Sequence, residues 1–379
     1  MFDCSLDYPD QPWWHAEDNY NRNVAILLYQ ADIEIRKRDH SAEAYRNAMR
    51  IIQGWRDEKI SLRQRMRIYY LIARANDAIG LTDKGIESVD HALSLAFALK
   101  SEFDVSKLLY HRARMNRSEL FFARAAEDAR DCMRIIDEHA PELVVESVTS
   151  VRLQLLPQLA TYEFYLSDFK AAKSHITAAR KLIAQTPDAS LPAAATAWVQ
   201  VNMDILKRRP GLAVAPSLQI CEIYALKGNP LSYERAEILA AQAALAFAES
   251  MPVGTHRDLA IEMALPHIAS AEHLAETLID RSGQALCQLE RAHFDRLANR
   301  NSGRKSKILG VIQFADDIDD VAVLAQAHVL LGDEFTALGE PGMANGCYRA
   351  TLDLLRDTEV PALGIPARRV LDEHDEFRL

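Results

Sequence analysis

The sequence predicts an all-α fold, a right-handed α-solenoid built from helix hairpins. Its 379 residues are 49% hydrophobic but only 7% aromatic, so Ala and Leu supply most of the apolar side chains. The chain contains only 14 Gly and 14 Pro, which favours long helices with few interruptions. Runs that alternate β-branched and polar residues, the usual signal of a strand, are almost absent.

A repeating pattern supports the same prediction. The segment Ser61–Ile136 reads as two consecutive helix hairpins. Small residues recur in it at an offset of 40, from Ala73 to Ala113 and from Gly85 to Ala125. This spacing predicts paired helices that approach each other closely at the small positions.

The spacing resembles that of the tetratricopeptide repeat, more in register than in residue identity. A third repeat follows at Val151–Ala184, where Asp168 starts the turn. The sharpest repeat is AQAHVLLGDEFTALGEPGMANGCYRATLDLL, in which Gly332 and Ala344 occupy the close-contact positions. The segments AFALKSEFDVSKLL and QFADDIDDVAVLAQA are also similar to the helical repeat regions of bacterial transcriptional regulators.

Four segments follow from this pattern. Residues 1–60 are expected to form an irregular lead-in and atypical capping helices, and residues 61–190 the tetratricopeptide-like repeats. The repeat register is lost in residues 191–301, which we interpret as divergent helical repeats broken at RRPGLAVAP, KGNPLS and MPVG. NSGRKSK reads as a polar basic loop. Residues 302–379 contain the last repeat and an acidic tail, with Pro361 and Pro366 ending the helical pattern.

The formal net charge of −10 argues against direct nucleic-acid binding and against binding to an anionic membrane surface. The N-terminus lacks the basic and apolar regions of a secretory signal, and no apolar run is long enough to span a membrane. The five cysteines are scattered and form no CxxC motif, as expected of small buried thiols in a reducing cytoplasm.

No enzyme motif is present: the sequence lacks GxxxxGK[ST], GxGxxG, GxSxG and HExxH, so we expect no catalytic residues. The sequence contains three groups of possible metal ligands, and none of them predicts a metal or cofactor site. Glu290 and His293 form a single ExxH pair, which we interpret as one surface turn. The second group does not share one helical face; its members are Glu262, His267, His273 and Glu276. The third group is an acidic run that is more simply the start of a helix; its members are Asp316, Asp317, Asp319 and Asp320.

In tetratricopeptide arrays the first helix of each pair lines the concave surface. The resemblance therefore implies a basic stripe there, with two equivalent tyrosines standing together. Arginines give bidentate hydrogen bonds to carboxylates, so this groove suits an acidic peptide or a free C-terminus. Asparagines at the equivalent positions of peptide-binding relatives hold the ligand backbone. The ten predicted ligand-binding residues are Arg67, Tyr70, Arg74, Asn76, Lys107, Tyr110, His111, Arg114, Asn116 and Arg117.

An equally weighted alternative is that these arginines pair with acidic residues on the neighbouring second helices. The candidates for such pairing are Glu87, Asp90, Glu127 and Asp131. Charged surfaces are common on helical repeats, and sequence alone leaves the two alternatives open.

We therefore predict a non-catalytic protein- or peptide-binding repeat protein, a scaffold or ligand-sensing regulator with a protein or acidic peptide as its partner. A second hypothesis is a signalling regulator resembling the Rap-type quorum-sensing receptors, although their catalytic glutamine matches neither Gln30 nor Gln53. A third is an enzyme with a site in residues 191–301. The resemblance also allows a homo-oligomer.

Overall fold

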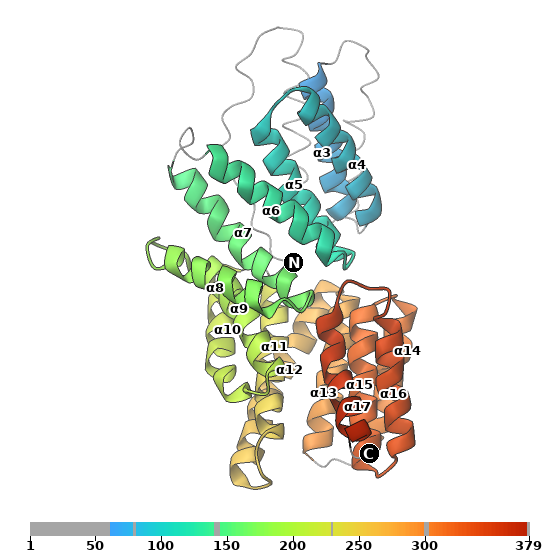
Figure 1. Ribbon diagram of the computed structural model, residues 1–379. Coiled ribbons are helices and arrows are strands. Elements are labelled where there is room, and N and C mark those ends of the chain that lie inside the picture. The colour runs from blue at the N-terminus through green and yellow to red at the C-terminus, as the bar shows by residue number, and fades with distance from the viewer. Residues whose placement is uncertain (1–60, 79–80, 140–144, 229, 299–302, 377–379) are drawn as a thin grey trace. The chain divides into compact units, whose positions relative to one another are not determined.

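The structure is a computed structural model that describes residues 61–78, 81–139, 145–228, 230–298 and 303–376. All regular structure in these ranges is helical, from α3 to α17, with two short 3-10 helices, η2 (Pro210–Leu212) and η3 (Pro361–Gly364) (Figure 1). The prediction of an all-α, tetratricopeptide-like repeat fold is thus confirmed. The predicted lead-in and capping helices of residues 1–60 lie outside the described residues.

The chain divides into two compact units, which are described separately. The N-terminal unit extends to Leu155, and the C-terminal unit begins at Leu156. The boundary falls inside helix α7 (Val145–Tyr165). The boundaries at 190 and 301 that the sequence predicts follow changes of repeat register, whereas this one follows the packing of the helices.

In its described residues, from 61 onward, the N-terminal unit contains two hairpins and the first part of α7. Helix α3 packs on α4, α5 packs on α6, and α4 packs on α5. Alanine side chains fill the contacts within each pair and have no exposed surface, as at Ala73 and Ala113. The four helices are α3 (Leu62–Ala78), α4 (Thr82–Ala98), α5 (Glu102–Ser118) and α6 (Phe122–His139).

The first hairpin has its closest approach at Gly85. A Cβ atom added there would lie 3.1 Å from the carbonyl oxygen of Ala73 and 3.4 Å from Sδ of Met115. The repeat places Ala125 in the equivalent slot of the second hairpin, where it is completely buried. The small residues found in the sequence pattern are therefore the points that allow the paired helices to touch.

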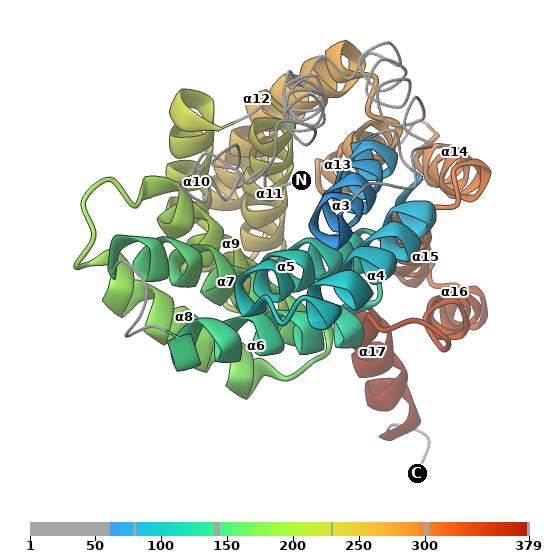
Figure 2. The same ribbon diagram turned by 90° about the horizontal axis from the view of Figure 1, so that it is seen from above.

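The C-terminal unit continues the hairpin pattern. The helices pair in order as α9 with α10, α11 with α12, α13 with α14, and α15 with α16. Figure 2 shows α13 and α15 in one layer and α14 and α16 in the next. Its helices after α7 are α8 (Phe169–Ile183), α9 (Ser190–Leu206), α10 (Val214–Lys227), α11 (Pro230–Glu249), α12 (Thr255–Leu278), α13 (Arg281–Leu297), α14 (Arg304–Asp317), α15 (Val321–Ala337), α16 (Pro341–Leu354) and α17 (Ile365–Glu376).

Two sequence-based expectations in this unit were wrong. The basic segment read as a loop enters α14 at Arg304, because carboxylates of the neighbouring helices hold its cations: Arg304 lies 3.2 Å from Glu334, and Lys307 lies 2.5 Å from Asp295. Helix α17 also forms beyond the prolines that were expected to end the helical pattern. Pro366 stands in its first turn, where a missing backbone N–H breaks no helical hydrogen bond.

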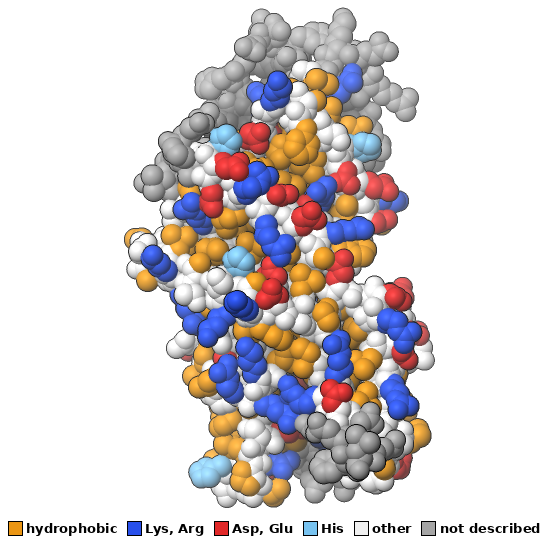
Figure 3. All heavy atoms as spheres, viewed as in Figure 1, with side chains coloured by type: hydrophobic (Ala, Val, Ile, Leu, Met, Phe, Trp, Pro, Cys, Tyr) orange, Lys and Arg blue, Asp and Glu red, His pale blue; other side chains and the backbone are white. Residues whose placement is uncertain are grey.

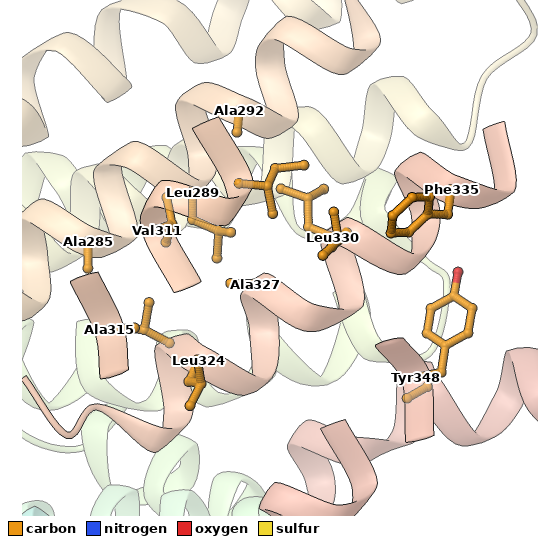
Figure 4. Close-up of a cluster of buried hydrophobic side chains, with 14 of the residues drawn as sticks. Ala285, Leu289, Ala292, Val311, Ala315, Leu324, Ala327, Leu330, Phe335 and Tyr348 are labelled. Carbon is orange, nitrogen blue, oxygen red and sulfur yellow. The ribbon is translucent and has the colours of Figure 1, made fainter. Parts of the chain in front are cut away.

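The last hairpin confirms the close contact predicted at Gly332. A Cβ atom there would lie only 2.6 Å from a ring carbon of Tyr348, a side chain on α16 that is 1% exposed. Figure 4 shows Tyr348 beside Phe335 in the apolar cluster of this unit. The hydroxyl of Tyr348 donates to Asp333 at 2.7 Å, which holds the ring in place.

We expect Gly332→Ala to lower the free energy of unfolding by about 1–3 kcal/mol, because the fixed Tyr348 ring cannot retreat from the added methyl group. Gly310→Ala on α14 is the matched control: a Cβ atom there meets no atom within 4 Å. That change should stabilise the protein by up to about 1 kcal/mol through helix propensity. Urea denaturation followed by circular dichroism measures both, and equal effects would contradict the close contact.

Candidate functional site

The predicted ligand-binding face is centred on a contact between Tyr70 on α3 and His111 on α5. The Tyr70 hydroxyl lies 2.6 Å from Nε2 of His111, and their ring centres are 4.9 Å apart in an edge-on arrangement. Tyr70 is 8% exposed and His111 is half-buried. Helices α3 and α5 are therefore joined near their midpoints by a polar aromatic pair.

Tyr110, the repeat equivalent of Tyr70, also has its ring against His111 but hydrogen-bonds to another residue. Its hydroxyl donates to Oε1 of Gln154 on α7 at 3.3 Å, and its side chain is completely buried. The rings of Tyr70 and Tyr110 both lie against the ring of His111, at 4.9 Å and 5.4 Å between ring centres, so the two equivalent tyrosines share one neighbour. Their hydroxyl groups take different partners, His111 for Tyr70 and Gln154 for Tyr110.

Two cations lie against the Tyr70 ring. Nζ of Lys107 is 5.1 Å from the ring centre, and Cζ of Arg74 is 5.8 Å from it. Both distances fall within the range of cation–π attraction. The two side chains come from α5 and α3 respectively, so positive charge from adjacent helices converges on one aromatic ring.

The same cations act on His111. Burial is the main cause that lowers the pKa of the His111 imidazole well below its usual value, and the charges of Arg114, Arg74 and Lys107 lower it further. His111 is therefore neutral at pH 7. The contact with Tyr70 adds no positive charge to a region that already gathers three cations.

One carboxylate opposes these charges. Burial raises the pKa of Asp77, while the charges of Arg114, Arg117 and Arg74 and a hydrogen bond from Thr82 lower it. Asp77 thus lies among the arginines as an internal counter-ion. We call the following set the tyrosine–cation cluster: Tyr70, Arg74, Asp77, Lys107, His111, Arg114 and Arg117.

Arg67 also lies on α3, but the charged groups that affect its pKa are Asp104 and Arg63. Burial lowers the pKa of its guanidinium to about 10, and the charge of Arg63 contributes, although the carboxylate of Asp104 opposes the change. This is the effect expected of a cation held among other cations and partly removed from water. Arg67 extends the positive region toward the start of α3.

The two asparagines lie in the packed interior. Asn76 is 6% exposed and Asn116 is 3% exposed. The amide of Asn116 donates to Oδ2 of Asp128 at 3.1 Å, and Asp128 also binds Arg112 at 2.6 Å. Because its amide is engaged inside the hairpin, we leave Asn116 and its equivalent Asn76 out of the site that we propose below.

Two of the four acidic residues that could pair with the basic stripe bind other arginines in the structure. Asp90 binds Arg112 at 2.6 Å, and Asp131 binds Arg134 at 3.3 Å. Neither of these arginines was among the predicted ligand-binding residues. Figure 3 shows basic and acidic side chains interspersed on the visible face of the N-terminal unit, as such pairing on the outer helices would produce.

The sequence motifs of the C-terminal unit form structural contacts. In the ExxH pair, His293 on α13 lies 3.8 Å from Glu290 and 3.7 Å from Glu249 on α11. Arg296 also binds Glu249. Burial opposes protonation, yet the two carboxylates raise the pKa of His293 to about 9. The group therefore connects two first helices as an ion-pair network.

The remaining candidates do not assemble as the sequence grouped them. Glu262, His273 and Glu276 are exposed on α12, whereas His267 turns to Glu237 on α11. Asp320 caps α15 by accepting from the backbone N–H of Val323 at 3.0 Å, as predicted for a helix start. Sequence reasoning missed Glu237, because nothing in the local pattern links residues 30 positions apart on different helices.

None of the helices in the described ranges combines the length and apolar character needed to cross a lipid bilayer.

No protein-family model and no curated protein sequence matches the chain. Several solved structures, however, have a similar fold. The apo form of the quorum sensor NprR from B. thuringiensis is similar with a TM-score of 0.64 and 14% identity, covering 90% of each chain. Aspartyl phosphate phosphatase F from Bacillus subtilis has a TM-score of 0.61 and 11% identity over 92% of this chain and 87% of its own. NprR in complex with its cognate peptide NprX has a TM-score of 0.57 and 15% identity over 92% of each chain. At these identities the likeness establishes a shared fold.

Asp128→Ala should destabilise the N-terminal unit by on the order of 2–4 kcal/mol, because it leaves the Arg112 guanidinium and the Asn116 amide without their shared acceptor. Asp131→Ala removes an exposed carboxylate that pairs with Arg134 on the same helix, and should have little effect. Thermal unfolding of both variants tests this, and similar midpoints for the two would contradict a structural role for Asp128.

The His293 network should make stability depend on pH. The pKa of His293 rises on folding from 6.5 to about 9, so its contribution is fully present below about 6.5 and is lost as the pH rises through about 9. His293→Gln should therefore lose stability relative to the wild type at pH 6 and progressively less toward high pH. Urea denaturation across this range measures the difference, and a pH-independent difference would argue against a protonated His293.

Proposed function

We propose that this chain is a non-catalytic, peptide-binding repeat protein that serves as a ligand-sensing regulator or scaffold, and that the tyrosine–cation cluster binds its ligand. The ligand is an acidic peptide or the free C-terminal carboxylate of one. The observation that carries the proposal is the convergence of Arg74, Lys107 and Arg114 on the Tyr70–His111 pair, in which burial and these cations lower the pKa of His111.

The chemistry of the cluster supports a carboxylate ligand. Two guanidinium groups can each give paired hydrogen bonds to a carboxylate, and the Lys107 ammonium adds a third positive charge. These cations also contact other groups of the chain, and Asp77 acts as their counter-ion. A ligand carboxylate would take over part of these contacts, so binding would exchange an internal partner for an external one.

A second and more specific candidate is a signalling regulator that resembles the Rap-type quorum-sensing receptors. The fold is shared with a quorum sensor over nine-tenths of both chains, and one of the similar structures contains a cognate peptide. This favours a short peptide over a folded protein as the ligand. One similar protein is named as a phosphatase, so dephosphorylation of a protein aspartyl phosphate is the activity to assay against our non-catalytic proposal.

The binding test uses fluorescence polarisation with a panel of short labelled peptides, each made with a free and with an amidated C-terminus and in acidic and neutral forms. We expect the acidic peptides with a free carboxylate to bind most tightly and the binding to weaken as salt is added. The double variant Arg74→Ala with Arg114→Ala should weaken binding by about tenfold or more, since each lost charge-assisted hydrogen bond contributes about 1.5–3 kcal/mol.

Arg124→Ala with Arg130→Ala is the matched control, because it removes the same charge from exposed positions of α6 in the same unit. This variant should bind like the wild type. Equal loss in both double variants would show only a non-specific charge effect, and no loss in either would place the ligand away from the tyrosine–cation cluster.

A further inference from the structure

Three side chains with metal-binding atoms meet in the C-terminal unit. Cys221 comes from α10, Glu237 from α11 and His267 from α12, and their ligand atoms all lie within 4.8 Å of one another. Among the described residues this is the one group of histidine, cysteine and carboxylate side chains that is so arranged. The sequence shows no motif for it, since three successive helices each contribute one residue.

The group is buried and internally ordered. Cys221 is 6% exposed and Glu237 is 5% exposed, while His267 is half-buried and leaves an approach from solvent. Nδ1 of His267 lies 2.5 Å from Oε2 of Glu237. The Glu237 carboxylate also raises the pKa of the Tyr233 hydroxyl, so a second polar side chain lies near this carboxylate beside His267.

We propose that Cys221, Glu237 and His267 bind one Zn²⁺ ion. Sulfur, imidazole nitrogen and carboxylate oxygen form a ligand set that zinc accepts and that magnesium and calcium, which prefer oxygen ligands, do not. A thiolate and a carboxylate together carry two negative charges, which balance a divalent cation. A neutral site of this kind can be buried at far lower cost than an unbalanced charge.

Small movements of the three ligand atoms would bring them to the spacing of a tetrahedral zinc site. Zinc bonds of the usual length place neighbouring ligand atoms about 3.4–3.6 Å apart. The His267–Glu237 contact would open by about 1 Å to admit the ion, with the thiol moving to a similar spacing. The fourth position falls to a water molecule entering on the His267 side. As the metal–sulfur bond forms, the thiol proton leaves to solvent, and the proton held between Nδ1 of His267 and Oε2 of Glu237 moves to Nε2 of His267, which frees both atoms to bind the ion.

The competing explanation is a hydrogen-bonded His267–Glu237 pair beside a core thiol. Burial raises the pKa of both the Cys221 and the Cys287 thiols to about 12, so neither thiol is distinguished by its acidity. What distinguishes Cys221 is the imidazole and the carboxylate within reach of its sulfur. Cys287 is therefore the matched control: it is equally buried, and carboxylates lie near it, but it belongs to no such group.

The experiment titrates the full chain, stripped of metal with a chelator, with Zn²⁺ in equilibrium dialysis and with Co²⁺ in an absorption spectrometer. We expect one Zn²⁺ per chain, a cobalt spectrum with the thiolate charge-transfer band and tetrahedral d–d bands, and a higher melting temperature with zinc. Cys221→Ser should abolish the charge-transfer band. His267→Gln and Glu237→Gln should each weaken zinc binding by about tenfold or more.

Cys287→Ser should retain the stoichiometry, the affinity and the cobalt band of the wild type. Circular dichroism on each variant establishes that it is folded, and the three separate ligand variants keep the test valid if one of them is not. Wild-type protein that takes up no zinc, or a cobalt band that survives Cys221→Ser, would overturn the proposal.

Discussion

The structure depends on the close approach of the two helices within each hairpin, which is possible only at small residues. At Gly85 a single added carbon would press on the Ala73 carbonyl, and at Gly332 it would enter the Tyr348 ring. First helices also contact the next first helix along the chain, as α11 contacts α13 and α13 contacts α15. Residues about 40 positions apart in the sequence, such as Tyr70 and His111, therefore come into contact.

This arrangement explains how an acidic chain gathers cations at one place. Arg74, Lys107 and Arg114 would repel a charged histidine, and their charges together with burial keep His111 neutral. Asp77 offsets part of the remaining repulsion from inside the protein. The hydrogen bonds of Asp128 with Arg112 and Asn116 join α5 to α6, and so stabilise the hairpin that carries Lys107, His111 and Arg114.

The hairpins and their small-residue contacts could be predicted from sequence, because both follow from local spacing. Gly332 and Ala344 are examples, and both are buried where the repeat placed them. Contacts between hairpins could not be predicted. The repeat identifies Tyr70 and Tyr110 as equivalent, but it does not show that each reaches the next helix, to His111 and to Gln154. The group of Cys221, Glu237 and His267 could not be predicted for the same reason. Its three residues lie on three separate helices, so they form no short sequence motif.

The most direct test of the account is the histidine side-chain NMR spectrum of the chain during titration with an acidic peptide that has a free C-terminus. The chain has 12 histidines, and a His111→Gln variant assigns the resonance of interest. If the tyrosine–cation cluster binds the peptide, the His111 ring signals start as those of a neutral imidazole and shift with saturation as the peptide binds. Saturable binding that leaves the His111 signals unchanged while others move would contradict the assignment of the site to the tyrosine–cation cluster.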